Sequence, residues 1–130
     1  MTQIFALLTT SLLFGGMVLY AFGFAAFLFS ALPPDLARRT IRAAFPHFYS
    51  FVFCMSLVTA ALVWPQNTLS AVLLAIVALT TVPARQLLMP AINRATDAHQ
   101  KSRFKWLHGA SVAVTLIHIG LVGLVLVRFI

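Results

Sequence analysis

Charged residues fall in three places along this chain and divide it into long uncharged stretches. The charges lie within residues 35–42, within residues 85–105 and at Arg128, which leaves residues 1–34, 43–84 and 106–127 without any. About 20 apolar residues, rising about 1.5 Å each, cross the roughly 30 Å hydrocarbon core of a bilayer. The last stretch is therefore long enough for one membrane-spanning helix and the middle stretch for two. The first stretch is interpreted as a single long, tilted helix.

Prolines and turn residues indicate where these helices end. The middle stretch breaks at residues 64–68, because Pro65 cannot continue a helix interior and Trp64 suits the membrane interface. Pro33 and Pro34 end the first helix. The pattern predicts an all-α, integral membrane four-helix bundle in a single domain. Its helices are expected at about 4–32, 46–64, 68–89 and 105–128, with basic loops at 33–45 and 90–104.

Two further prolines shape the predicted helices. Pro46 suits the first turn of the second helix, where its missing N–H costs nothing. Pro83 lies inside the third helix and is expected to kink it. Residues 92–100 could form a short helix at the membrane interface.

The composition supports a membrane protein and excludes several other classes. Hydrophobic residues make up 62% of the 130 residues and charged residues 8%, with one cysteine. A soluble domain of this size could not bury so much apolar surface, and disordered chains and disulfide scaffolds have other compositions. The net charge of +7 does not imply nucleic-acid binding, because no soluble basic module is present.

The basic residues predict an orientation. Eight of the nine lysines and arginines lie in the two internal charged segments and the ninth is Arg128. The positive-inside rule then places both segments in the cytoplasm and both termini outside, in what we interpret as a bacterial cytoplasmic (inner) membrane. Basic side chains at this face are expected to bind lipid headgroups; they are Arg38, Arg39, Arg42, Lys101, Arg103 and Lys105.

Polar residues inside the predicted helices form two stripes. At about 100° per residue, His108, Ser111, Thr115 and His118 share one face of the last helix. By the same arithmetic, His47, Ser50 and Cys54 share one face of the second helix. Both faces are expected to point into the bundle, where they could meet. His118 lies about 15 Å inside its helix, so it needs a hydrogen-bonding partner.

Small residues predict packing seams. Gly16, Tyr20, Gly23 and Phe27 share a face of the first helix, and Gly109, Ala113, Leu116, Gly120 and Gly123 share a face of the last. Such faces let helices approach closely in lipid, either within one bundle or between subunits of a homo-oligomer or larger complex.

No catalytic motif is visible. The two carboxylates, Asp35 and Asp97, lie in the basic segments. The expected partners are Arg38 or Arg39 for Asp35, and Arg94 or Lys101 for Asp97. Without a carboxylate inside the membrane, an ion-coupled carrier acting alone is disfavoured.

Two short sequence patterns suggest a family. Gly16 to Phe27 is followed by Pro33-Pro34 and by Phe45-Pro46-His47-Phe48-Tyr49, and later come Pro90-Ala91-Ile92-Asn93 and the segment Phe104 to Ser111. These patterns resemble the family called "domain of unknown function 4149", which includes transmembrane protein 205-like proteins. The resemblance implies a four-helix membrane protein with no established reaction, and it singles out Pro46, Tyr49, Pro90, Asn93, Phe104, His108 and Ser111. A looser similarity links the chain to copper-resistance D-like membrane proteins.

Three functions remain open at this stage. The first is an accessory or structural subunit, or an oligomeric transport component, without catalytic machinery. The second is a protein that binds haem b or copper through His47, His108 and His118, with Cys54 as a further metal ligand and His47 paired with His108. The third is an enzyme that modifies lipids at the interface, with Arg38, Arg39, Arg42 and Arg94 holding a phosphate.

Overall fold

The protein consists of four long helices joined by three short turns. The structure, a computed structural model, describes residues 1–130. Thr2–Ala31, Pro34–Val63, Thr68–Asp97 and Lys101–Val127 are each long and apolar enough to cross a membrane. The all-α fold, the four membrane-spanning helices and the break at residues 64–68 are confirmed. At that break, Asn67 caps the third helix by accepting a hydrogen bond from the Ser70 backbone N–H at 2.9 Å.

Two of these helices are divided by a π-helical turn. The first comprises α1 (Thr2–Val18), the π-helix η1 (Leu19–Phe24) and α2 (Ala25–Ala31). The second is α3 (Pro34–Val63), and the last is α6 (Lys101–Val127). The third comprises α4 (Thr68–Pro83), η2 (Ala84–Leu88) and α5 (Met89–Asp97). The backbone thus leaves α geometry directly after Pro83, where the sequence predicts a kink, whereas η1 was not predicted.

The basic segments are helical, so the loops expected at 33–45 and 90–104 are wrong. Helix α3 begins at Pro34, with Asp35 in its first turn, and Pro46 lies in its interior. The second basic segment continues α5 to Asp97, and only residues 98–100 form a turn, with His99 at φ 54°. Thirty residues of helix measure about 45 Å, against roughly 30 Å of hydrocarbon core. Charge therefore marks where the helices leave the membrane, and not where they end.

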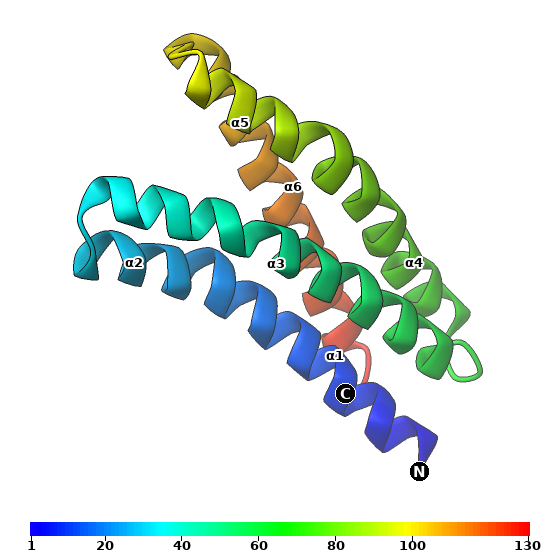
Figure 1. Ribbon diagram of the computed structural model, residues 1–130. Coiled ribbons are helices and arrows are strands. Elements are labelled where there is room, and N and C mark those ends of the chain that lie inside the picture. The colour runs from blue at the N-terminus through cyan, green and yellow to red at the C-terminus, as the bar shows by residue number, and fades with distance from the viewer.

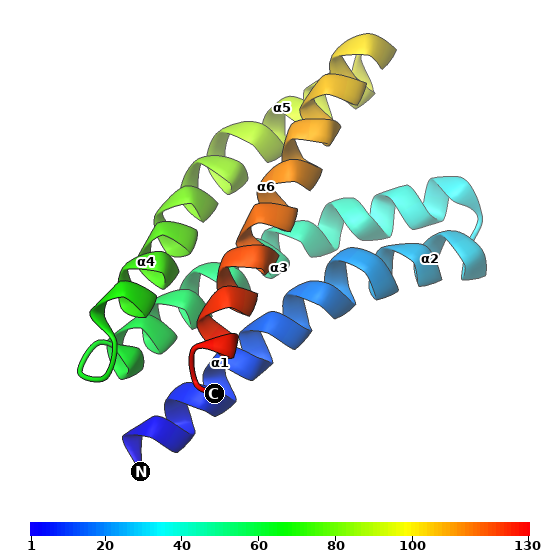
Figure 2. The same ribbon diagram turned by 180° about the vertical axis from the view of Figure 1, so that it is seen from behind.

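The two helical hairpins diverge toward the basic end. The hairpin of α1, η1, α2 and α3 meets the hairpin of α4, η2, α5 and α6 near the chain termini, which lie close together (Figure 1). There α3 packs along α4 and α1, and α6 packs against α1 and α4. Seen from behind, α2 and α6 separate toward the opposite end, with α3 between and behind them (Figure 2). The basic turns lie at this open end, so both basic segments share one side of the molecule.

An aromatic cluster fixes the first helix on α3 at the open end. The Tyr20 ring stacks on Phe48 at a centroid distance of 4.6 Å and meets Phe45 edge-on at 5.8 Å. Phe48 and Tyr49 are buried, as is Met17 one turn below. Aromatic pairs of this kind contribute about 0.5–1.5 kcal/mol beyond their buried area. The cluster therefore stabilises the packing of η1 against α3.

The predicted glycine seams are confirmed only in part. A Cβ on Gly16 would lie 2.8 Å from the Phe51 ring of α3, and one on Gly123 would lie 3.2 Å from Phe14 of α1. Both glycines therefore permit close helix packing inside the bundle. A Cβ on Gly109 or on Gly120 would have no neighbouring atom within 4 Å. Phe27 is 63% exposed, because η1 shifts the helical phase between Gly16 and Phe27.

Candidate functional site: a groove between the hairpins

The divergence of the hairpins leaves a cavity of about 530 Å³ at the basic end, called the groove below. This volume falls within the roughly 300–1,000 Å³ typical of small-molecule sites. The back wall is α3, one side is η1 and α2, and the other side is α5 and α6. The 21 lining residues are Ala21, Phe22, Ala25, Phe29, Arg38, Arg39, Ile41, Arg42, Phe45, Phe48, Tyr49, Met89, Ile92, Asn93, Thr96, Phe104, His108, Ser111, Val112, Thr115 and Leu116.

The sides of the groove open toward the lipid between α2 and α6. Phe22 and Phe29 on one side are 55% and 53% exposed, and Val112 and Leu116 on the other are 42% and 48% exposed. These apolar side chains form the two edges of the opening. On α6 the lining residues run from Phe104 to Leu116, a length of about 18 Å along the helix. An apolar chain could therefore enter sideways from one leaflet.

Arginines surround the outer end of the groove. Arg38, Arg39 and Arg42 all lie on the first turns of α3 and line it. Arg38 forms an exposed ion pair with Asp35, at 3.3 Å from Nη1 to Oδ1, as the sequence predicts. Arg39 forms no ion pair. This guanidinium is therefore free for an anion.

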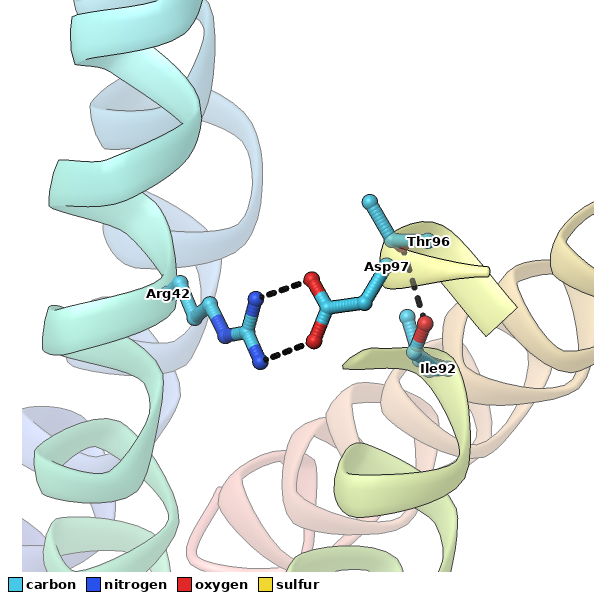
Figure 3. A network of polar contacts seen from close by, with 4 residues as sticks. All are labelled: Arg42, Ile92, Thr96 and Asp97. Carbon is cyan, nitrogen blue, oxygen red and sulfur yellow. Dashed lines mark hydrogen bonds and ion pairs between the residues drawn. The ribbon is translucent and has the colours of Figure 1, made fainter. Parts of the chain in front are cut away.

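Arg42 extends across to α5 and forms a bidentate ion pair with Asp97 (Figure 3). Its Nη1 donates to Oδ1 at 2.7 Å and its Nη2 to Oδ2 at 2.9 Å. The expected pairing of Asp97 with Arg94 or Lys101 is therefore wrong. Neighbours along the chain are the usual partners, and the sequence does not show that α3 approaches α5. Beside this pair, the Thr96 hydroxyl donates to the Ile92 carbonyl at 2.9 Å, within the last turns of α5 (Figure 3).

Polar side chains line the inner part of the groove. Tyr49 of α3 and Ser111 of α6 are 3% and 8% exposed, and their hydroxyl oxygens lie 3.2 Å apart. His108 lines the groove one turn nearer the basic end, its ring stacked on Phe104 at a centroid distance of 5.4 Å. Asn93 lines it from α5. The inner wall thus offers hydroxyl, imidazole and amide groups.

The polar face predicted for the second helix points out of the bundle, which is a correction. His47, Ser50 and Cys54 are exposed, and neither His47 nor Cys54 lines the groove. The buried face of α3 carries Phe48, Tyr49 and Val52. The ligand pair of His47 with His108 therefore has no support from this geometry, and no group of three or more His, Cys, Asp or Glu residues could hold a metal ion. Binding of haem b or copper remains a prediction.

His118 has the partner that its depth requires. Its side chain is 5% exposed, and its Nε2 lies 2.7 Å from the Thr80 hydroxyl of α4. The Thr80 hydroxyl also lies 2.7 Å from the Ile76 carbonyl oxygen, and the tautomer of His118 decides which group donates in the contact between the two side chains. His118 does not line the groove, so it joins α6 to α4 in the lower bundle.

The remaining basic residues lie at the same end but outside the groove. Lys101, Arg103 and Lys105 are exposed on the first turns of α6. Lys105 and Trp106 border a separate shallow hollow along α6, together with Gly109 and Ala113. Their positions suit contact with lipid headgroups around the protein.

Comparison with known proteins identifies the family. A family described as "Domain of unknown function (DUF4149)" matches residues 8–101. The chain belongs to the DUF4149 family. No curated protein and no solved structure matches it, and nothing among these comparisons supports the looser similarity to copper-resistance D-like proteins.

Several residues that carried the family resemblance gather at the groove. Tyr49 and Asn93 lie within the matched DUF4149 range, whereas Phe104, His108 and Ser111 lie beyond it, yet all five line this one cavity. Pro46 and Pro90 lie on the same helices without lining it. The two sequence patterns thus describe opposite walls of a single site.

Sequence reasoning missed the wall formed by the first helix. Ala21, Phe22, Ala25 and Phe29 line the groove, but in the sequence they are ordinary apolar residues of a membrane span. Their spacing is that of a regular helix face, and periodicity alone does not show that this face lines a cavity instead of contacting lipid. A π-helical turn has no simple sequence signal, although such turns often occur at functional sites.

Proposed function

We propose that this protein binds an anionic, phosphate-bearing amphiphile in the groove, without catalysing a reaction on it. The observation that carries the proposal is the order of surfaces along one cavity. Arginines stand at the membrane interface, hydroxyl and amide groups follow, and apolar side chains border an opening to lipid. This order matches that of a phosphorylated lipid lying in its own leaflet.

Arg39 is the residue we assign to the phosphate. Asp97 already occupies the Arg42 guanidinium with two hydrogen bonds, and Asp35 pairs with Arg38. Arg39 lines the groove beside them and has no carboxylate partner. Guanidinium groups suit phosphate because they donate parallel hydrogen bonds in a fixed fork.

The test is binding of dodecyl phosphate to the full-length protein in neutral detergent. We expect a saturable rise in thermal stability, because a ligand that binds only the folded state stabilises it by about 2.7 kcal/mol at 100 times its Kd. Arg39→Gln should weaken this binding about tenfold or more. Arg103→Gln removes another exposed arginine, one outside the groove, and serves as the matched control. Equal binding by wild type and both variants, or none by wild type, would refute the assignment.

We also propose that the basic end faces the cytoplasm of a bacterium. The support is the gathering of both basic segments at one end of the fold, opposite the termini and Arg128, combined with the positive-inside rule.

A second proposal concerns assembly through α6, as expected of an accessory subunit or an oligomeric component. Gly109 and Gly120 are exposed, with open space around a built Cβ, so a neighbouring helix could approach α6 closely. The test is the oligomeric mass of the purified protein in detergent. A Gly109→Leu, Gly120→Leu double variant should shift an oligomeric wild type toward monomer, and a strictly monomeric wild type would exclude self-association.

A further inference from the structure

We infer that the ligand of the groove is an acyl-ester lipid whose carbonyl oxygen accepts a hydrogen bond from the Tyr49–Ser111 pair. This inference rests on the proposed function, because it identifies the class of amphiphile that the groove holds. It distinguishes phosphorylated acylglycerols from phosphorylated isoprenoids, which carry no carbonyl group.

Tyr49 and Ser111 have more hydroxyl hydrogens than their mutual contact uses. Tyr49 and Ser111 each have one hydroxyl hydrogen, and the single contact between their oxygens uses only one of the two. Both side chains are more than nine-tenths buried. A buried donor without an acceptor costs about as much as a lost hydrogen bond. One donor therefore remains to be satisfied by whatever fills the cavity.

The Tyr49–Ser111 pair differs from other buried hydroxyls in the helices by facing the groove. Four buried hydroxyls without a partner do not line it: those of Tyr20, Ser56, Thr59 and Ser70. Thr10, Ser50 and Thr81 each donate to a carbonyl four residues earlier in the same helix, at 2.7–2.9 Å. Ser111 makes its hydrogen bond to Tyr49 of another helix. The pair thus spans the groove from α3 to α6, and its hydrogens are not committed to the backbone of either helix.

The Tyr49–Ser111 pair lies at the depth of a lipid ester group. Tyr49 lies seven residues beyond Arg42 on α3, about 10 Å further into the membrane. Val112 and Leu116 border the opening alongside and below Ser111. A phosphorylated acylglycerol presents its groups in this sequence: phosphate, then ester carbonyl, then acyl chain. The residues along the groove follow it in the same order.

The decisive experiment compares two phosphatidic acids of equal chain length, one with ester linkages and one with ether linkages, in neutral detergent. We expect the wild type to bind the ester lipid about three- to tenfold more tightly, the difference that one net hydrogen bond makes. A Tyr49→Phe, Ser111→Ala double variant should bind both lipids with the affinity of the ether form. Tyr20→Phe and Ser56→Ala remove buried hydroxyls that have no partner and do not line the groove, so they should keep the preference.

A spectroscopic measurement guards against a merely structural effect. With a ¹³C-labelled ester lipid, the carbonyl stretch of the bound lipid should lie at lower frequency in the wild type than in the double variant. Equal binding of ester and ether lipids by wild type, with no difference in the stretch, would overturn the inference and leave the amphiphile proposal standing. Failure of both lipids to bind would overturn the two together.

Discussion

Arg42 and Asp97 join helices α3 and α5, 55 residues apart in sequence, through two hydrogen bonds of 2.7 and 2.9 Å at the outer end of the groove. Both side chains are about half exposed, at 48% and 57%. The pair therefore contributes little to stability, and its importance is geometric. It connects the two hairpins where their backbones have diverged.

Breaking this ion pair should cost little stability and loosen the outer end of the groove. Exposed ion pairs contribute little to the free energy of unfolding, because water and salt screen the two charges. Asp97→Asn, Arg42→Gln and the double variant form a cycle that isolates the coupling by unfolding in mixed micelles. Spin labels on α2 and α5 should report a broader distance distribution in either single variant. A coupling energy of zero with unchanged distances would contradict this role.

Two adjacent glycines should respond in opposite ways to the same substitution. Gly16→Ala places a methyl group 2.8 Å from the Phe51 ring, and crowding of this kind costs about 1–3 kcal/mol. Gly15→Ala meets nothing within 4 Å and should be neutral or stabilising by up to about 1 kcal/mol, because alanine favours helix. Thermal unfolding in one detergent compares the two. Equal effects would show that the seam between α1 and α3 is looser than described.

The contact between Thr80 and His118 should contribute measurably to the stability of the folded protein. Thr80→Val leaves the buried imidazole of His118 without its partner, which costs about 1–3 kcal/mol. Thr80→Ser should keep most of the stability, since it retains the hydroxyl. Thr9→Val is the control, because Thr9 bonds only to its own helix. If Thr80→Val proved as stable as Thr9→Val, the contact would have no energetic role.

Both termini should lie outside the cytoplasm. Reporter enzymes fused to residue 1 and to residue 130 are expected to be active only on the non-cytoplasmic side, because the basic ends of α3 and α6 remain inside. The control is a reporter inserted in the turn at residues 98–100, which should give the opposite result. A cytoplasmic signal from the C-terminal fusion would invert the orientation.

The sequence predicts the fold well because the physical signal is strong. Uncharged stretches separated by basic residues can satisfy their backbone in lipid only as helices, so the number of helices and their turns could be foreseen. The positions where the helices end on the basic side could not be predicted. Hydropathy reports where the membrane stops, while residues such as Arg42 and Asp97 continue the helix into water.

The candidate site was only half predictable. The face containing His108 and Ser111 follows from 3.6-residue periodicity on an unbroken helix. The residues of α3 that lie opposite this face could not be predicted. His47 and Cys54 were expected opposite it, but Phe48 and Tyr49 occupy the inner face of α3, because aromatic packing against Tyr20 sets the rotation of this helix.

The π-helical turn at Leu19–Phe24 has a consequence for how this protein tolerates changes in length. A π turn accommodates one more residue than the α-helix around it, so deleting one residue there would restore regular winding. Because the π turn absorbs the extra residue, everything from Ala25 onward would keep its rotation relative to α1, and Phe29 would stay in the groove. Related chains that lack this extra residue should therefore carry their bulky groove-facing aromatics one position earlier.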